Sequence, residues 1–550
     1  MGLRIRLVEP RPPGHSVYDH VLLPRLGLPL MATMLAEGGH DTAVFCEMLG
    51  PIDLGECLVA DLVGISGTTA TQPAGYALAD ELSAAGVAVV LGGPHVSFRV
   101  EEALEHAPYV ARGEGQQTIL ELVAALEREA PLDGVAGLSW RDGLGEAHHN
   151  PARSRCSQTE FERLPIPDLS LIEGHERLEV KPAMTQWGCP FDCEFCSVTA
   201  QFSRVVRHRR SDQVLAELAG LSTNELFFHD DNFVVNKRRT TELLRAMVGA
   251  GLTPNFAAQM RADTVLRSRA SPEIDHEFLE LLGQAGCRMA MVGFESISEE
   301  NLARIGKRTS VAVSEQAVRA FHRHGIAVHG MFVVGLDFDD ASSAEATAAF
   351  ARRLGIDTFQ LMMLTPLPGT RLWQRLESEG RLLEADWTLF DGHHAVLRPE
   401  RMTPLELQLS TLDAMRRFYS RSAIAGSALR GVLRHLPGLL GIATRHTGGL
   451  MRALGREALG PRQGDAATNA TATPNVAAFD ARGLDASAPS GPVVGRALAR
   501  VASSLTRDER ARLEAALGVA ALRLYGRRRV ADFSDQGHSR SHIARLAALP

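Results

Sequence analysis

Lysine is almost absent from this chain of 550 residues. Only Lys181, Lys237 and Lys307 occur among its 58 basic residues, so nearly all of the positive charge is arginine. The formal net charge is −7, which argues against a protein whose main partner is the backbone of a nucleic acid. Because alanine and glycine are also frequent, we attribute the arginine bias to base composition rather than to phosphate binding.

Aromatic residues, long hydrophobic runs and paired cysteines are scarce as well. Aromatic residues make up 5%, which excludes large stacking surfaces. No apolar run approaches the roughly 18 residues of a membrane-spanning helix, and the first residues have the pattern of a strand rather than of a signal peptide. Seven cysteines are too few for a disulfide framework. We therefore expect a cytoplasmic protein of about three or four domains.

The first 150 residues alternate short apolar runs with amphipathic helical patterns. This alternation is typical of parallel βαβ units and predicts an α/β fold with a doubly wound parallel sheet of the Rossmann type. Ligands of such sheets bind at the carboxyl ends of the strands. The predicted strands are 4–8, 42–46, 62–66, 87–91 and 109–112, and the predicted helices are 29–37, 73–85, 100–105 and 117–127.

After a connector over 151–180, a second strand–helix alternation runs over 181–384. Its six units predict a partial (β/α)6 barrel, similar to a TIM barrel, with the active site at the carboxyl ends of the strands. The predicted strands are 182–187, 225–229, 255–259, 288–294, 328–334 and 358–364, and the predicted helices are 211–221, 237–250, 272–285, 310–324, 342–354 and 371–379.

The remaining residues predict a helical C-terminal region in three parts. Residues 385–462 form a helical extension, residues 463–495 a disordered linker rich in small and polar residues, and residues 496–550 a helical basic tail. The basic amphipathic stretch 430–456 has two interpretations: it lies on a membrane surface and delivers a lipid-like substrate, or it packs as a helix pair against a partner. We favour packing.

Three cysteines stand close together directly after the first strand of the second alternation. Cys189, Cys193 and Cys196 have the spacing C-x3-C-x2-C. Thiolates are the ligands of iron–sulfur clusters, and three of them can bind three irons of a four-iron cluster and leave the fourth open to a substrate or cofactor. A zinc site is the alternative, but zinc normally takes a fourth ligand at regular spacing, and His208 is poorly placed for it.

With this motif in this position, the chain resembles the radical S-adenosylmethionine (SAM) superfamily over residues 181–380. The resemblance implies a [4Fe–4S] cluster on the three cysteines and a 5′-deoxyadenosyl radical formed from SAM by one-electron reduction. The ends of the second, third and fourth barrel strands would hold SAM. The candidate SAM contacts are Asp230, Asp231, Asn232, Gln259, Arg261, Glu295 and Ser296.

The resemblance implies different roles in SAM binding for these residues. One of Asp230, Asp231 and Asn232 would bind the SAM ammonium group, and Glu295 and Arg261 would meet the ribose and the carboxylate. The ordinary alternatives are structural: a strand-end turn with a helix N-cap at 230–232, and helix capping after Glu295.

The first 150 residues resemble the cobalamin-binding domain that precedes many radical SAM barrels. Small residues at the carboxyl ends of the predicted strands would let a flat corrin ring and its nucleotide tail approach the backbone. The motif D-x-H-x-x-G is missing, since Asp19 and His20 are adjacent, so a cobalt ligand from that motif is not expected. A domain of this fold without cofactor is the alternative. The candidate cobalamin contacts are Ser66, Thr68, Gly92, Gly93 and His95.

A histidine pair follows the barrel. His393 and His394, with Asp391, resemble a segment found after the barrel in a subgroup of cobalamin-type radical SAM proteins. We name the two histidines as candidate catalytic acid–base residues, since imidazole titrates near neutral pH. A structural or exposed pair is the alternative.

These resemblances predict a cobalamin-dependent radical SAM C-methyltransferase that acts on an unactivated carbon. A cobalamin-type radical cyclase or rearrangement enzyme is the alternative among enzymes, and a non-catalytic iron–sulfur or cobalamin sensor or electron carrier is the alternative outside them. A tRNA methylthiotransferase is disfavoured, because such proteins have three cluster cysteines in the N-terminal domain, where this chain has only Cys46 and Cys57.

The expected partners follow from this prediction. We expect a small-molecule, lipid or peptide substrate and an electron donor such as flavodoxin or ferredoxin. We expect no nucleic-acid partner, no transmembrane segment, and at most peripheral contact with a membrane.

Overall fold

A computed structural model describes residues 2–11, 22–383, 386–420, 542, 545–547 and 549. The helices and strands below belong to one compact unit, formed by Met1–Phe418 and Arg529–Pro550. The predictions for Asp19 and His20, for the stretch 430–456, for the linker 463–495 and for nearly all of the tail 496–550 lie outside the described residues. None of the described helices is long and apolar enough to cross a membrane.

The first sheet has seven strands in the order β2-β1-β3-β4-β5-β6-β7. The first five strands in sequence are parallel, which confirms the predicted doubly wound sheet. The strand order reverses between β1 and β3, so the carboxyl ends of these two strands form the topological switch point, where sheets of this kind bind ligands. The parallel strands are β1 (Arg4–Glu9), β2 (Asp41–Cys46), β3 (Leu62–Ser66), β4 (Ala88–Gly92) and β5 (Tyr109–Ala111).

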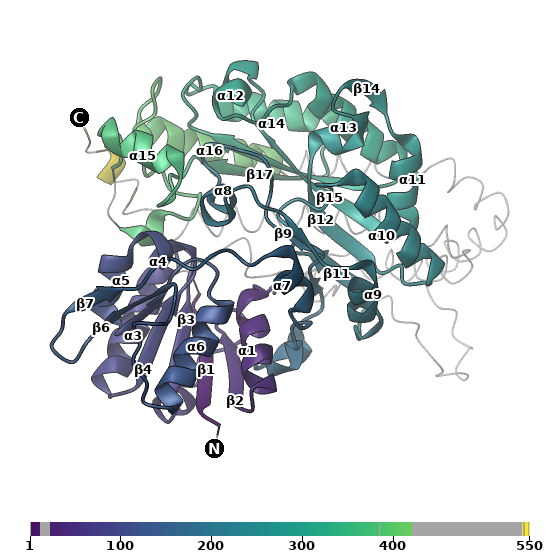
Figure 1. Cartoon of the computed structure of the whole chain (residues 1–550). Helices are drawn as coiled ribbons and strands as arrows, with labels where there is room; N and C mark the ends of the chain where they lie inside the picture. Colours follow the sequence, from purple (N-terminus) through teal and green to yellow (C-terminus); the bar gives the residue numbers. More distant parts are fainter. Residues whose placement is uncertain are drawn as a thin grey trace, which may run out of the picture. The chain divides into compact units, whose positions relative to one another are not determined.

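Helices cover both faces of this sheet (Figure 1). Successive side chains of a strand point to opposite faces, so Leu7 joins the core under α1 and α6 whereas Val8 joins the core under α3 and α5. Burial on both faces explains why these strands are almost continuously apolar. The helices are α1 (Gly27–Glu37), α2 (Leu54–Leu58), α3 (Gln72–Ala84), α4 (Pro94–Phe98), α5 (Val100–His106) and α6 (Gln116–Glu127).

The last two strands of this sheet are absent from the sequence prediction. Strand β6 (Leu138–Arg141) pairs antiparallel with β5, and β7 (Ala147–His149) pairs antiparallel with β6. Asp142 holds the turn between them, because its carboxylate accepts the backbone N–H groups of Leu144 and Glu146, each at 2.9 Å. Strand β7 is short and polar, so its sequence lacks the apolar alternation that predicts a strand.

The second sheet has six parallel strands in the order β17-β16-β15-β12-β11-β8, which confirms the predicted partial barrel. Strands β8 and β17 are its two edges, and within the described residues they pair with other strands but not with each other. The strands are β8 (Lys181–Ala183), β11 (Glu225–Phe228), β12 (Asn255–Arg261), β15 (Cys287–Glu295), β16 (Ala327–Val334) and β17 (Thr358–Met363).

The predicted first barrel strand, 182–187, is divided in two. Its second part is β9 (Gln186–Trp187), which pairs antiparallel with β10 (Arg207–His208) rather than with the barrel. In the connector, α7 (Gln158–Arg163) begins with a capping box, in which Ser157 and Glu160 satisfy each other's backbone N–H groups.

The six predicted barrel helices are present, one of them with a wrong boundary, and α12 (Glu299–Arg304) is a further helix that was not predicted. The helix predicted from Pro272 begins only at His276, because Ser271–Ile274 is strand β14 in a hairpin with β13 (Leu266–Ser268). Asp275 caps that helix by accepting the backbone N–H of Phe278. The barrel helices are α9 (Ser211–Ala219), α10 (Lys237–Gly249), α11 (His276–Gln284), α12 (Glu299–Arg304), α13 (Val311–Arg323), α14 (Ser343–Leu354) and α15 (Arg371–Ser378).

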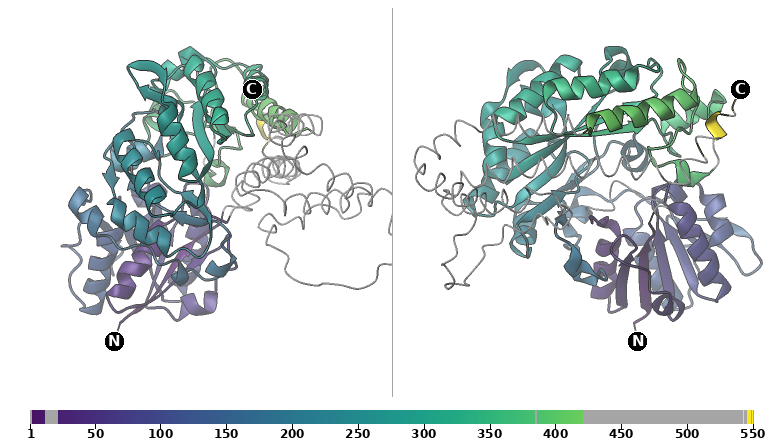
Figure 2. Two further views of the ribbon diagram at one scale, coloured as in Figure 1. Left: turned by 90° about the vertical axis from the view of Figure 1, so that its right-hand side faces the viewer. Right: turned by 180° about the vertical axis from the view of Figure 1, so that it is seen from behind.

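Of the predicted helical extension 385–462, the described part ends at residue 420 and holds one α-helix, α16 (Pro404–Phe418). It packs on β17 and α14, and Figure 2 shows it lying along this side of the barrel sheet. The extension therefore contributes to the core of the barrel rather than forming a separate bundle over these residues.

Candidate functional site

The three clustered cysteines lie on one loop between β9 and α8 (Ser197–Phe202). All three thiols are free and half-buried. We call residues 188–196 the cluster loop. It leaves β9 through Gly188, whose φ is 86° and where a Cβ would overlap the backbone carbonyl of Val205. Only glycine fits at this position.

Burial raises the pKa of all three thiols, and it raises that of Cys193 to about 11 although the nearby ammonium of Lys307 opposes the shift. Metal binding at these thiols must therefore release protons. Among the described residues, no group of three or more His, Cys, Asp or Glu side chains could hold a single metal ion. The ligands of a four-iron cluster bind different irons and need not meet at one point, so the cluster loop fits a cluster rather than a mononuclear metal.

Asp230 and Asp231 support the segment that leads into this loop. The Asp230 carboxylate is fully buried and accepts the backbone N–H of Thr185 at 2.7 Å and its hydroxyl at 2.5 Å. Burial raises the pKa of Asp230 to about 7. Asp231 accepts the backbone N–H of Gly188 at 2.9 Å, and burial raises its pKa to about 6. Both carboxylates thus face protein donors.

Asn232, the third candidate at this strand end, differs from the two aspartates. The side chain of Asn232 is buried, and the Oδ1 atom of this side chain has no hydrogen-bond partner. Asn232 therefore has a buried acceptor available for the predicted contact with the SAM ammonium group. Gln259, at the end of β12, is half-buried, and its carbonyl accepts the backbone N–H of Phe233.

Arg261 connects the end of β12 to the cluster loop. Its guanidinium pairs with Asp263 at 2.9 Å, donates to the backbone carbonyl of Lys307 at 2.7 Å and lies 3.8 Å from the ring centroid of Phe191. Phe191 belongs to the cluster loop, so Arg261 packs beneath the cysteines. The hydrogen bonds of Arg261 use its Nε and Nη2 atoms, and the predicted contact with the SAM carboxylate stays a prediction.

Glu295 ends β15 in an unusual backbone conformation. Its φ is 65°, a left-handed value that non-glycine residues adopt mainly where the surroundings enforce it. Its carboxylate lies 2.6 Å from the ammonium of Lys307. The next residue, Ser296, is buried and accepts the backbone N–H of Ser298, which fits the capping alternative. Sequence reasoning missed Lys307, although its rarity as one of three lysines was a usable signal.

Arg25 spans the switch point of the N-terminal sheet. Its Nε atom donates to the carboxylate of Glu9 at 2.7 Å, and its Nη2 atom donates to the carbonyl of Ser66 at 2.8 Å. Glu9 ends β1 and Ser66 ends β3, so one side chain joins both sides of the switch point. Thr68 is exposed beside them. Nothing in the sequence pattern singled out Arg25.

The three candidate cobalamin contacts at and after the end of β4 have different surroundings. A Cβ built on Gly92 would meet no atom within 4 Å, so this strand end borders open space. Gly93 has φ of 107°, and a Cβ there would lie 2.6 Å from the carbonyl of Gly67. His95 is buried and turned elsewhere: it lies 3.4 Å from the carboxylate of Glu102, which also accepts the indole N–H of Trp387 at 2.8 Å.

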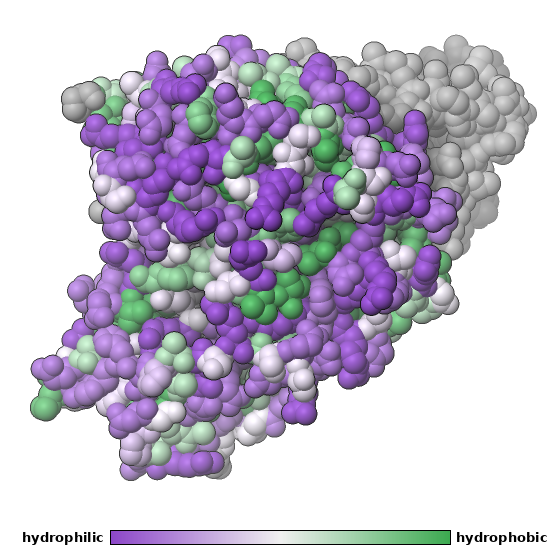
Figure 3. Space-filling view, turned by 45° about the horizontal axis from the view of Figure 1, so that its top comes forward, coloured by the Kyte–Doolittle hydropathy of each residue, from purple (hydrophilic) through white to green (hydrophobic). Residues whose placement is uncertain are grey.

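The carboxyl ends of the two sheets face each other. Burial, and next the positive charge of Arg25, lower the pKa of His229 at the end of β11 to about 4, so its imidazole is neutral at pH 7. A Cβ on Gly369, beyond β17, would overlap the ring of Phe98 from α4. Both sheets therefore direct their ligand-binding edges toward one region. On the face shown in Figure 3, hydrophobic side chains gather near the middle of an otherwise mostly hydrophilic surface.

The histidine pair lies beyond β17. His394 is buried, and its Nδ1 atom lies 3.0 Å from the Asp391 carboxylate. The carbonyl of His393 accepts the side-chain amide of Gln408 at 2.9 Å, which fixes the loop to α16. These contacts give the pair a structural part, and its catalytic role stays a prediction.

Comparison with known proteins agrees with this geometry. The sequence model of the radical SAM superfamily matches residues 185–351. An uncharacterized methyltransferase of Pyrococcus horikoshii is 30% identical over 457 residues, which cover 77% of this chain and 97% of the relative.

Two further relatives have named reactions. Bacteriochlorophyllide d C-12(1)-methyltransferase of Chlorobaculum tepidum is 27% identical, over 76% of this chain and 88% of the relative. The anaerobic magnesium-protoporphyrin IX monomethyl ester cyclase of Synechocystis is 26% identical, over 74% of this chain and 84% of the relative.

Two solved structures share the fold. One is the radical SAM methyltransferase TsrM from Kitasatospora setae, with a TM-score of 0.58 and 19% identity over 69% of this chain and 76% of that one. The other is the cobalamin-dependent SAM radical enzyme OxsB, solved with aqua-cobalamin and SAM bound, with a TM-score of 0.61 and 16% identity over 100% of this chain and 84% of that one. The cluster loop, the two sheets and the extended match to the Pyrococcus relative show that this chain belongs to the radical SAM superfamily, as an enzyme that uses a [4Fe–4S] cluster and SAM.

Proposed function

We propose that the protein is a cobalamin-dependent radical SAM C-methyltransferase that acts on an unactivated carbon. The observation that carries the proposal is the opposition of the two ligand-binding edges. The switch point of the first sheet, at Arg25, lies close enough to His229 of the barrel for its charge to act on that imidazole. A cofactor on the first sheet would thus stand over the barrel mouth, beside the cluster loop.

When bound, the reduced cluster and SAM supply a 5′-deoxyadenosyl radical, and cobalamin supplies the methyl group. Cys189, Cys193 and Cys196 would hold the cluster. Asn232, with its unused acceptor, and Glu295, fixed by Lys307, are the residues best placed to hold SAM.

The strand ends at the switch point and beside it leave room for a flat cofactor. Gly92 borders open space, and Ser66 and Thr68 present small polar side chains at the neighbouring strand end. His95 lies against Glu102 through its Nε2 atom and packs on Trp387, while its Nδ1 atom is buried without a hydrogen-bond partner. We therefore keep His95 as a candidate cobalamin contact that also links the two sheets.

The relatives support methyl transfer more than cyclisation. Two of those described above bear methyltransferase names and one is a cyclase. A cyclase on the same framework is therefore the second candidate. Two of these relatives act on tetrapyrroles by name, so we include this class among the small-molecule, lipid and peptide substrates. We propose flavodoxin or ferredoxin as electron donor and the cytoplasm as location.

The test is the set of products that the reconstituted full chain makes from SAM under a strong reductant. Methyl transfer predicts both 5′-deoxyadenosine and S-adenosylhomocysteine, because SAM serves as radical source and as methyl source. A cyclase would form 5′-deoxyadenosine alone. Failure to form either product with an intact cluster would contradict both candidates.

A further inference from the structure

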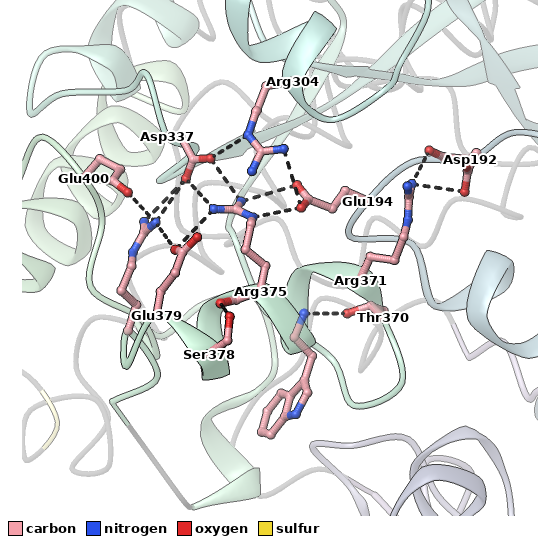
Figure 4. A network of polar contacts seen from close by, with 12 residues as sticks. Asp192, Glu194, Arg304, Asp337, Thr370, Arg371, Arg375, Ser378, Glu379 and Glu400 are labelled. Carbon is pink, nitrogen blue, oxygen red and sulfur yellow. Dashed lines mark hydrogen bonds and ion pairs between the residues drawn. The ribbon is translucent and has the colours of Figure 1, made fainter.

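Two acidic residues lie between the cluster cysteines and pair with arginines. Asp192 precedes Cys193, and Glu194 follows it. Their side chains point to α15, the helix that follows the last barrel strand, as Figure 4 shows. No function assigned above uses them.

Glu194 is held by its backbone and by its side chain. Its backbone N–H donates to the carbonyl of Ile305 at 3.1 Å, and its carbonyl accepts the N–H of Leu372 at 3.1 Å. Its carboxylate lies 2.8 Å from the guanidinium of Arg375 and 3.7 Å from that of Arg304. The carboxylate is 11% exposed, so solvent screens these contacts only in part.

Arg375 extends the network to the carboxyl end of β16. Its guanidinium lies 3.0 Å from Asp337, which also pairs with Arg304 at 3.1 Å and with Arg381 at 3.4 Å. The two carboxylates and two arginines at the centre alternate in charge, so each is neutralised by neighbours from a different element (Figure 4).

Asp192 adds a second connection to the same helix. Its carboxylate lies 3.1 Å from Arg371, whose guanidinium also donates to the Asp192 backbone carbonyl at 2.9 Å. Gly306 makes room on the other side, because a Cβ there would lie 2.9 Å from that carbonyl. The cluster loop is thus fixed on both sides of Cys193.

The position of this network in the fold gives it a function. The cluster loop follows the first barrel strand, β8, by way of β9, and α15 follows the last, β17. Within the part of the chain that the structure describes, these strands are the two edges of the barrel sheet and do not pair with each other. At the carboxyl end of the sheet, ion pairs between side chains therefore connect the segments that follow the two edges, which strand pairing does not connect.

We propose that Glu194 and Arg375 are positioning residues that fix the cluster loop across the open edge of the barrel, and so set the orientation of the cluster toward SAM. The proposal depends on the cluster and on SAM, not on cobalamin or on methyl transfer. Failure of the methyltransferase proposal would leave it standing.

The test uses the full chain, reconstituted anaerobically with iron and sulfide. Glu194→Gln and Arg375→Gln each remove one charge and the shortest contact of the Glu194–Arg375 pair from this partly buried network. We therefore expect about tenfold faster loss of the cluster to EDTA than in the wild type. We also expect the electron paramagnetic resonance signal of the reduced cluster to broaden and to respond less to added SAM. Arg375→Lys, which keeps the charge, should restore most of both properties.

The control is the Glu315–Arg353 pair, a more exposed contact of 2.9 Å that joins α13 and α14 away from the cluster loop. Glu315→Gln and Arg353→Gln should match the wild type in both measurements. Should Glu194→Gln fail to fold, Arg371→Gln removes the exposed contact to Asp192 and should give a smaller change of the same kind. Wild-type EDTA rates and SAM responses in the Glu194, Arg375 and Arg371 variants would overturn the proposal.

Discussion

At the scale of single residues, burial determines which groups of the site carry a charge. The pKa of Cys193 is raised to about 11, so the free thiol is protonated at neutral pH and becomes a ligand only by exchanging its proton for iron. Asp230 and Asp231 have pKa values raised to about 7 and 6. Their surroundings favour the neutral carboxyl far more than water does.

Cys193→Ala removes one of the three cluster ligands. We expect the variant to lose the cluster absorbance at about 400 nm after anaerobic reconstitution. Cys156→Ala, a half-buried thiol outside the cluster loop, is the matched control and should keep the absorbance. An intact four-iron spectrum in the Cys193 variant would refute the ligand assignment.

Asp230 predicts a pH dependence of stability. Its pKa is raised from 3.8 to about 7 by burial, so between these values the unfolded state loses the proton that the folded state keeps. The contribution of the protonated Asp230 carboxyl to the free energy of unfolding is fully present below the unfolded-state pKa of 3.8. It is lost as the pH rises through the folded-state pKa of about 7. Relative to Asp230→Asn, the wild type should lose up to about 1.4 kcal/mol of unfolding free energy per pH unit from about pH 5 to pH 7. Parallel pH profiles from urea denaturation would contradict this assignment.

The sequence indicates which residues are candidates for the site better than it indicates where their side chains point. The cysteine spacing identified the cluster ligands because the motif itself carries the chemistry. The sequence also marked Asp230 and His95 by their place at strand ends, but it could not show that one faces Thr185 and the other Glu102. Direction at a strand end depends on the following turn, which the apolar pattern does not encode.

At the scale of elements, the parallel strands were predictable because burial on both faces makes them continuously apolar. The strands that escaped prediction are short: the β6–β7 hairpin, the β13–β14 hairpin and the split of the first barrel strand into β8 and β9. Tertiary pairing rather than local pattern creates them. The domain limits 1–150 and 181–384 remain predictions.

The end of β4, next to β3, offers a test of the proposed cobalamin site. Gly92→Val places a side chain, suited to a strand, in the open space at the end of β4. We expect normal folding and iron content but at least about tenfold weaker binding of hydroxocobalamin, because the added methyl groups occupy the cofactor's position. Gly134→Val, also in open space but in a distant loop, should bind as the wild type does. Equal affinity of both variants would place any cobalamin elsewhere.

At the scale of the whole molecule, contacts between residues far apart in the sequence hold the two sheets with the carboxyl ends of their strands toward each other. Glu114 forms a buried ion pair of 2.7 Å with Arg207 of β10, and Glu102 accepts the indole N–H of Trp387. These contacts join a loop and helix α5 of the first sheet's domain to β10 and to the extension after the barrel. The proposed function requires that this arrangement hold a cofactor of the first sheet over the cluster loop.

The most direct measurement is the metal content of the full chain after anaerobic reconstitution with iron, sulfide and hydroxocobalamin, followed by desalting. The proposed function predicts about four iron atoms and one cobalt atom per chain, together with the absorption of both cofactors. Four iron atoms without cobalt would contradict cobalamin-dependent methyl transfer while leaving the radical SAM barrel intact.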